Sequence, residues 1–161
     1  MPHGADSGPD GGVVVAVIPT PAQVLLGTDA VAHVWTCNED GTPQVSVVWV
    51  VLQNDEILFG TSASSRKARN LARDPRVVLS IEDEERNERG FQRHLIIHGT
   101  ASMTPGPDAQ LMDRLAMKYV GLHRHPLALR DSPSMVVVRV AVDRISGVGP
   151  WVSERVSAVG T

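Results

Sequence analysis

Short apolar runs separated by polar turns dominate the chain and predict a protein built mainly of β-strands. The runs are rich in β-branched valine, and clusters of Asn, Asp and Gly bound them. Between two of these runs, Asp40-Gly41 is typical of a β-hairpin turn, because glycine tolerates a positive φ. We therefore expect a meander of three strands, over Val31–Cys37, Pro43–Leu52 and Ile57–Thr61.

The second half of the chain continues this pattern. Apolar runs predict strands over Arg76–Ile81, Gln92–Met103 and Met135–Val148, the last with valines on alternating positions. The polar stretches Glu82–Gly90 and Gly121–Ser132 are expected to be loops.

Helical spacing interrupts the strands at three places. Thr20 followed by Pro21 is typical of an N-cap and first helical residue, and predicts a short helix ending near Leu26. Ser64 and Ser65 are expected to cap a helix that begins near Arg66, is stopped by Asp74-Pro75 and carries an apolar stripe of Ala68, Leu71 and Ala72. A third helix is expected over Asp108–Tyr119.

About six strands joined mostly by tight turns exclude a doubly wound sheet, because parallel strands need a crossover helix between almost every pair. The pattern favours a mainly β (α+β) fold, an antiparallel barrel with three short helices packed outside it. Residues 1–12 hold four of the fourteen glycines and, apart from Met1, no large apolar side chain, and we expect a disordered tail there. Residues 13–161 are expected to form a single domain.

Composition narrows the classes of function. The 161 residues are 42% hydrophobic and 20% charged with a net charge of −3, as in ordinary globular proteins. A nucleic-acid partner is not expected, because phosphate-neutralising domains are strongly basic. The single cysteine, Cys37, excludes an internal disulfide. No apolar run approaches the roughly 20 residues of a membrane span, and no secretory signal is evident, so we expect a cytoplasmic protein.

The densest candidate chemistry lies between Thr61 and Arg76, where five of the fifteen basic residues fall within eleven positions. This stretch joins a strand to a helix and is rich in hydroxyl groups. Free amide groups at a helix N-terminus, together with Arg and Lys side chains, form an anion site, most simply for a phosphate. The alternative is an ordinary solvated helix face.

Metal and nucleophile sites are not expected. His94 and His98 share a strand face but lie nearly 13 Å apart along it at the usual rise per residue, too far for one ion. The loop histidines His123 and His125 have no acidic or cysteine partner nearby in the sequence. Cys37 has no neighbouring base to activate its thiol. We therefore assign no metal ligand and no catalytic side chain.

Several motifs together resemble a known family. They are the Asp-Gly hairpin, the strand Pro43–Trp49, the block Ser65–Arg76, and the later segments His98–Ala101 and Asp143–Trp151. Over about Pro19–Trp151 the chain resembles the pyridoxamine-phosphate-oxidase-like split-barrel flavoproteins, and within them it is most similar to the deazaflavin-dependent oxidoreductases of actinobacteria.

The resemblance implies a homodimer with two flavin or deazaflavin sites at the subunit interface. It places the cofactor phosphate at Arg66 and Lys67, with Ser65 beside them as a further cofactor-binding residue. It also implies that Val45, Ser46, Val47 and Trp49 lie along the ring system of the cofactor. Thr61 and Ser62 are expected near its ribityl–phosphate region. Trp151, in the C-terminal segment, is expected to form an apolar wall. For Trp49 and Trp151 the alternative is ordinary packing.

The same resemblance separates two cofactors. Oxidases of the family that use FMN on pyridoxamine phosphate carry further basic residues on the second strand, whereas Val45–Val51 has none, and their C-terminal Arg-His motif is absent. We therefore expect coenzyme F420, with FMN as the alternative, and hydride transfer between the deazaflavin and a small conjugated or polycyclic substrate. Another alternative is a non-catalytic protein that carries the cofactor or binds a haem-type ligand.

Overall fold

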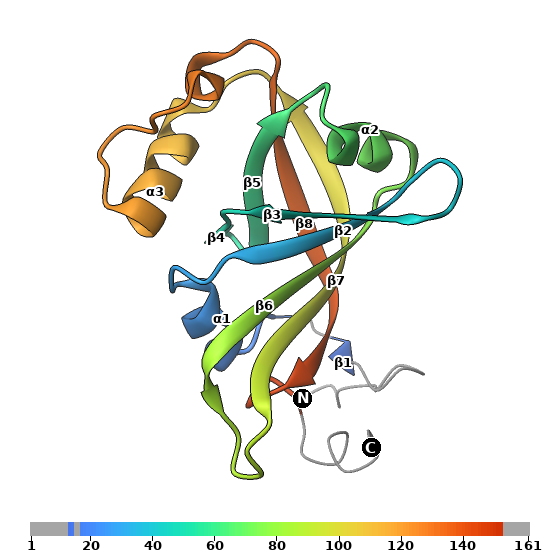
Figure 1. Ribbon diagram of the computed structural model, residues 1–161, viewed down its shortest axis with the longest axis vertical. Coiled ribbons are helices and arrows are strands. Elements are labelled where there is room, and N and C mark those ends of the chain that lie inside the picture. The colour runs from blue at the N-terminus through green and yellow to red at the C-terminus, as the bar shows by residue number, and fades with distance from the viewer. Residues whose placement is uncertain (1–12, 15–16, 153–161) are drawn as a thin grey trace.

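The computed structural model describes residues 13–14 and 17–152, in which strands make up most of the regular structure (Figure 1). The strands are β1 Val13–Val14, β2 Ala32–Cys37, β3 Pro43–Val48, β4 Val51–Gln53, β5 Glu56–Ser62, β6 Arg76–Arg86, β7 Gln92–Pro105 and β8 Met135–Val148. The helices are α1 Thr20–Leu26, α2 Arg66–Arg73, α3 Ala109–Val120 and the 3-10 helix η1 Ala128–Asp131.

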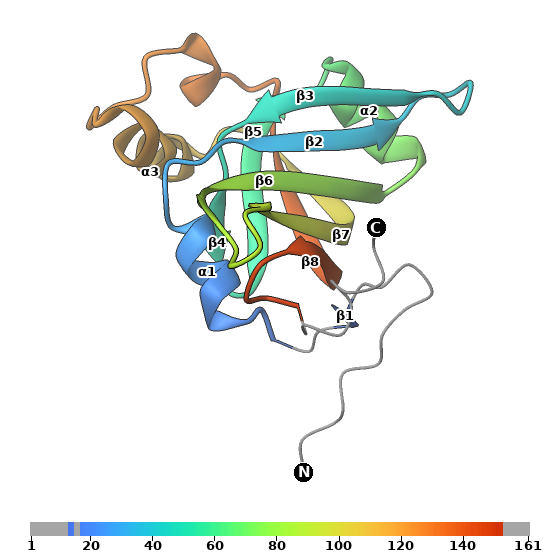
Figure 2. The same cartoon turned by 60° about the horizontal axis from the view of Figure 1, so that its bottom comes forward.

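One antiparallel sheet contains all the strands, in the order β3-β2-β6-β7-β8-β5-β4, with β1 beside β8. The sheet curls so that the β2–β3 hairpin runs across β5, β7 and β8 in the view of Figure 1, while α2 and α3 lie on either side of β5 (Figures 1 and 2). This confirms the expected mainly β split barrel with three helices. The described residues contain eight strands rather than about six.

The expected strand Pro43–Leu52 is two strands that belong to different parts of the sheet. Within the part of the chain that the structure describes, β3 pairs only with β2, whereas β4 pairs with β5, so the predicted three-strand meander was wrong. The break falls at Val50, whose backbone N–H donates to the Tyr119 hydroxyl at 3.1 Å and whose carbonyl accepts from Lys118 Nζ at 2.6 Å. Because side chains of α3 bind both of its polar groups, the backbone leaves the sheet there.

Two hydrophobic clusters hold the fold together. The larger fills the barrel with side chains from the inner faces of most strands and from α1; its fully buried members include Val34, Ile57, Phe59, Leu79, Ile97 and Ile145. The smaller lies between α3 and the outer side of β5 and β8, and its buried members are Leu58, Leu111, Met112, Leu115, Met135 and Val137. The two layers of packing place β5 between the barrel interior and α3.

Local details correct three other expectations. Pro19, not Thr20, occupies the N-cap of α1, and the Gln23 side chain instead donates to the Ile18 carbonyl at 2.7 Å. The expected apolar stripe of α2 included Ala72, but Ala72 is exposed and the buried positions are Ala68, Asn70 and Leu71. Asn70 is buried because its side-chain amide donates to residues of the β2–β3 hairpin. Strand β6 extends to Arg86, beyond the expected Ile81, because it pairs with β7 in a long hairpin. The expected tail, residues 1–12, lies outside the described residues.

Candidate functional site

The junction between β5 and α2 is fixed by a short chain of hydroxyl groups. Thr61 Oγ1 donates to Ser65 Oγ at 3.1 Å, and Ser65 Oγ accepts from the Ala68 backbone N–H at 3.2 Å. Ser65 is thus the N-cap of α2, as the sequence predicted. The N–H groups of the first helical turn that the cap does not bind are left pointing out of the helix end.

The loop before α2 is equally constrained. Ser62 Oγ and Ser64 Oγ lie 2.9 Å apart, and the Ala63 N–H donates to the Ser134 carbonyl at 2.8 Å, which ties the loop to the start of β8. Residues Thr61–Lys67, which we call the α2 corner, therefore form a rigid strand-to-helix turn with hydroxyl groups along its rim.

The two basic residues of the α2 corner differ in exposure. Arg66 is exposed and makes no hydrogen bond within the described residues, while Lys67 is half-buried. Burial lowers the pKa of Lys67, and no hydrogen bond or ion pair to its ammonium comes from any residue that the structure describes. A desolvated cation without a counter-charge is stabilised by an anion, so this corner is suited to bind one.

Two other residues of the basic run, Arg73 and Arg76, have structural partners. The Arg73 guanidinium donates to the Cys37 carbonyl and, at 3.4 Å, to Asn70 Oδ1. Arg76 pairs with Asp74 at 2.7 Å, and its hydrogen bonds lower the pKa of that carboxyl to about 2. Arg69 is exposed. The structure thus separates Arg66, Lys67 and Arg69 from Arg73, which binds a backbone carbonyl of the hairpin, and Arg76, which pairs with a carboxylate.

Strand β3 presents different side chains to its two sides. Val45 and Val47 point outward and are 47% and 56% exposed, whereas Ser46 points inward, paired in register with the buried Val34. The inner side is the one that α2 covers, since Asn70 of α2 donates to Thr36, which in turn donates to Gln44 on the same face of β3 as Ser46 (both 3.0 Å). The predicted site residues of β3 therefore lie on two different surfaces, Val45 and Val47 on the outer one and Ser46 on the inner one.

Ser46 stands out on the inner side. Its Oγ is buried and has no hydrogen-bond partner among the described residues. A buried hydroxyl left without a partner costs roughly 1–3 kcal/mol, so its presence beside α2 needs an explanation. The hydroxyl is thus a polar group on the inner side of β3 that no described residue satisfies.

Trp49 lies one residue beyond β3 and packs against the end of α3. Its ring stacks on Tyr119, with 5.3 Å between centroids and 4° between planes, and meets the His125 ring edge-on at 5.6 Å. The sequence analysis placed Tyr119 at the end of the third expected helix and considered His125 only as a metal ligand. Nothing local in the sequence connects positions so far apart to Trp49.

Trp151 lies elsewhere. Its ring is only 3% exposed, its Nε1 donates to the His94 carbonyl at 3.1 Å, and the Arg93 guanidinium lies 5.4 Å from the ring centroid. The indole is packed within its own chain and presents almost no surface. Its predicted role as a cofactor wall stays a prediction, and we leave it out of the site proposed below.

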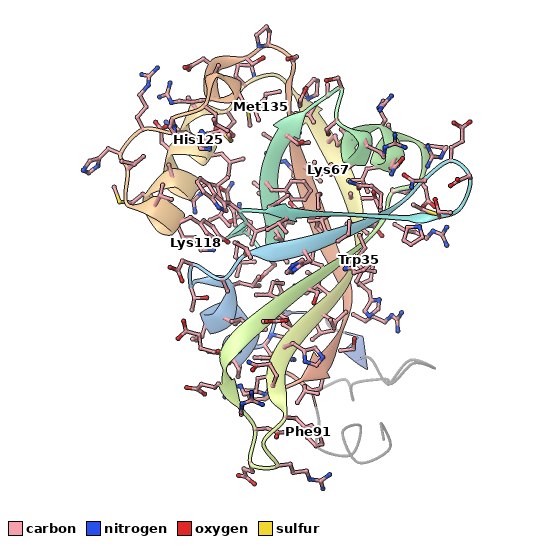
Figure 3. The ribbon with its side chains drawn as sticks, in the orientation of Figure 1. Trp35, Lys67, Phe91, Lys118, His125 and Met135 are labelled. Atoms are coloured by element: carbon pink, nitrogen blue, oxygen red, sulfur yellow. The ribbon has the colours of Figure 1, made fainter. Side chains whose placement is uncertain are left out.

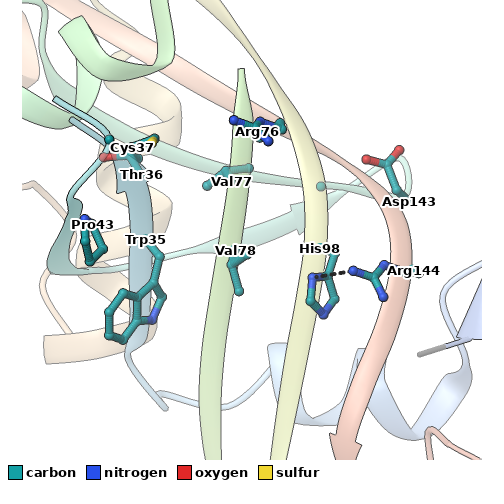
Figure 4. A pocket seen from close by; sticks show the side chains of 12 residues that line it. Trp35, Thr36, Cys37, Pro43, Arg76, Val77, Val78, His98, Asp143 and Arg144 are labelled. Atoms are coloured by element: carbon teal, nitrogen blue, oxygen red, sulfur yellow. Dashed lines mark hydrogen bonds between the residues drawn. The ribbon is translucent and has the colours of Figure 1, made fainter. Parts of the chain in front are cut away.

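A shallow groove of about 500 Å³ crosses the outer face of the barrel over β2, β6, β7 and β8 (Figure 4). Trp35 borders one side, and the other side carries His98 and Arg144, whose Nδ1 and Nη2 are 3.3 Å apart. Burial lowers the pKa of His98. Within the described residues, no group of three or more His, Cys, Asp or Glu side chains is placed to hold a metal ion.

None of the helices in the described part of the chain is both long and apolar enough to cross a membrane.

The described architecture matches known proteins. The family model described as pyridoxamine 5'-phosphate oxidase matches residues 22–149. Among solved structures, an F420 reductase is 25% identical with a TM-score of 0.68, covering 80% of this chain and 98% of its own. A conserved hypothetical protein from Mycobacterium tuberculosis is 21% identical with a TM-score of 0.66, covering 97% and 94%.

A third structure, the haem storage protein HutZ from Vibrio cholerae, is 18% identical with a TM-score of 0.63 and covers 81% of this chain and 94% of its own. At that identity the likeness shows the fold only. No curated protein matches the chain. Because the family model spans most of the barrel and the solved structures share its split-barrel fold, the chain belongs to the pyridoxamine 5'-phosphate oxidase family.

Proposed function

We propose that this protein is an oxidoreductase that binds coenzyme F420 and transfers hydride between it and a small conjugated or polycyclic organic substrate. The observation that carries the proposal is Lys67, a half-buried ammonium without a described partner at the end of α2. The likeness to an F420 reductase at 25% identity supports the choice of cofactor.

The α2 corner fits the anionic part of such a cofactor. Arg66 and Lys67 supply two cations, and the open end of α2 supplies backbone N–H groups and the positive end of its dipole. Thr61 and Ser62 line the turn beside them, with the Ser62 hydroxyl partly exposed. Arg69, exposed one turn along, extends the positive surface for a longer anionic tail.

The edge of β3 fits the ring. As an edge strand it has backbone N–H and C=O groups that no neighbouring strand binds, and Ser46 Oγ adds a buried hydroxyl without a described partner. The segment Val45–Val51 contains no basic residue to clamp a short phosphate-bearing flavin. This favours F420 over FMN.

A bound deazaflavin supplies hydride donor or acceptor chemistry through its ring. The chain's own residues then have three tasks. The α2 corner fixes the anionic end, β3 and Ser46 orient the ring, and Trp49 limits access of water at the far end. No dedicated acid or base is assigned among the described residues, and the proton that a substrate takes up after accepting hydride would come from solvent.

We also propose that a second copy of the chain covers the outer face, defined by Trp35, Val45 and Val47. These side chains are 42–56% exposed. They lie next to one another, because Trp35 pairs with Val45 and because Val45 and Val47, two residues apart on β3, point to the same side. Because β3 presents Ser46 inward and the two valines outward, one strand would serve both the cofactor site and the interface. Val47→Glu should convert a dimer to monomer in sedimentation experiments; a wild-type monomer would contradict this arrangement.

The experiment that tests the cofactor assignment is equilibrium titration with F420 and with FMN, followed by fluorescence. We expect tighter binding of F420. Tighter binding of FMN, or FMN retained in stoichiometric amount through purification, would overturn the assignment.

A second measurement separates an enzyme from a carrier. Protein loaded with reduced F420 is mixed with a panel of conjugated ketones and quinones, and the absorbance of the oxidised cofactor is followed. Oxidation faster than that of the free reduced cofactor supports catalysis. Binding without acceleration for every acceptor would favour the carrier.

A further inference from the structure

The last turn of α3 carries a half-buried cation, Lys118, that the proposed mechanism does not use. Lys118 Nζ donates to the carbonyls of Leu26 and Val50, each at 2.6 Å, and lies 4.8 Å from the centroid of the Tyr119 ring. Neither contact is to a carboxylate. The side chain therefore joins the end of α1 and the β3–β4 link to α3.

Tyr119 completes the same connection. Its hydroxyl donates to the Ala30 carbonyl at 3.0 Å and accepts from the Val50 N–H at 3.1 Å. Val50 thus has both backbone groups bound by side chains of α3. We call Lys118 and Tyr119 the α3 anchor.

Trp49 is the side chain that this anchor positions. It precedes Val50 directly, stacks on Tyr119 and remains partly exposed. The Trp49 ring also contacts the His125 ring. The backbone N–H of His125 donates to Asp113 Oδ1 at 2.9 Å. Asp113 also accepts from Arg130 Nε at 2.7 Å and from its Nη2 at 2.9 Å, so the loop behind His125 is fastened to α3 as well.

Figure 3 shows Lys118 and His125 on the α3 side of the barrel and Lys67 beside α2. The loop that begins with His125 returns to the α2 corner, where the Ser134 carbonyl accepts from the Ala63 N–H at 2.8 Å. This loop therefore links the neighbourhood of Trp49 to the α2 corner, and Asn70 of α2 is tied to Gln44 of β3 through Thr36. That arrangement places a flat aromatic surface at the end of the proposed ring site opposite its phosphate end.

We propose that Lys118 is a positioning residue: by holding the backbone of Val50 it fixes the ring of Trp49 as the flat wall against which a planar substrate lies. The inference rests on the proposed function for the substrate's identity as a planar conjugated compound. Lys118 itself touches neither substrate nor cofactor. Its effect is transmitted through Val50 to the neighbouring indole.

The test uses the full chain labelled with 5-fluorotryptophan, whose three resonances are assigned with Trp35→Phe and Trp49→Phe. Lys118→Met keeps the length of the side chain and removes its donors. We expect the Trp49 resonance to shift or broaden while those of Trp35 and Trp151 stay unchanged. Arg114→Met is the matched control, because Arg114 is an exposed cation of the same helix whose one side-chain hydrogen bond within the described residues is to Gln53. An unchanged Trp49 resonance in folded Lys118→Met would overturn the proposal.

Kinetics provide the second readout. With F420 saturating, Lys118→Met should raise KM for a planar quinone up to about tenfold, the scale of one aromatic contact, and change the Kd of F420 less than twofold. Lys118→Arg should restore part of the loss. Equal losses for the quinone and for a non-planar enone would indicate a general structural role and overturn the inference.

Two further outcomes are distinguishable. If Lys118→Met does not fold, Tyr119→Phe takes its place, because it keeps the stacked ring and removes only the hydroxyl; a Trp49 resonance that moves supports the anchor, and one that does not move contradicts it. If wild-type protein fails to bind F420, the proposed function fails, while the fluorine spectra still test the positioning of Trp49.

Discussion

The chain contains only two lysines, and the structure uses them in opposite ways. Both are half-buried, and burial lowers the pKa of each. Lys118 has two carbonyl acceptors within 2.6 Å, whereas Lys67 has no described partner. The first lysine completes the protein's own hydrogen bonding. Lys67, in contrast, requires an anion from outside the protein. This difference distinguishes a structural cation from a binding cation.

The largest expected difference between the two lysines is in cofactor affinity. Lys67→Glu should weaken F420 binding roughly a hundredfold, because it removes a charge-assisted contact worth about 1.5–3 kcal/mol and adds repulsion. The loss should be steeper at low salt. Titration at two ionic strengths measures it, with Arg89→Glu in the β6–β7 turn as control. Similar losses for both variants would mean a general charge effect rather than a site.

The second effect is on stability. Lys118→Met should lower the free energy of unfolding by about 2 kcal/mol, since two carbonyls lose a donor. Lys67→Met should leave stability unchanged or slightly raised, because it removes a desolvated charge without a described partner. Denaturant unfolding of the ligand-free protein compares them. A larger loss for Lys67→Met would reverse the roles assigned to the two residues.

A third comparison lies within α2. Arg73→Met should destabilise the fold by about 1 kcal/mol, because the Cys37 carbonyl and Asn70 lose a donor. Arg69→Met should change stability little and weaken F420 binding a few-fold by lowering the positive charge near its tail. Unfolding and binding measured on the same two variants decide whether the basic run is divided as the hydrogen bonds indicate.

The smallest effect concerns pH. Burial lowers the pKa of Lys118 to about 8 from its ordinary 10.5, so above pH 8 the folded chain releases a proton that the unfolded chain still holds. Stability should therefore rise with pH from about 8 toward 10, and this rise should be reduced in Lys118→Met. Burial raises the pKa of Tyr119, so above pH 10 the slope should turn downward. An identical pH slope in wild type and Lys118→Met would contradict this.

The features that sequence predicted well are those with local causes. Ser65 caps α2 because its own hydroxyl reaches the Ala68 N–H three residues on, and the bounds of β8 follow its valine pattern. The break at Val50 was missed because its partners lie 68 and 69 positions away. For the same reason the hydroxyls of the α2 corner were expected together, while the contact of Trp49 with Tyr119 was not.

Strand β8 gives the fold a consequence for how the chain assembles. It pairs with β7 along nearly its whole length and with β5 across seven registered positions, from Glu56 opposite Ala141 to Ser62 opposite Met135. Those latter pairs join residues separated by more than seventy positions of sequence. The chain loses conformational entropy when such long loops close, before the strand contacts can stabilise it. Barrels of this topology therefore fold slowly. During synthesis, the β5–β4 hairpin and the α2 corner must wait for the last strand before either acquires its final neighbours.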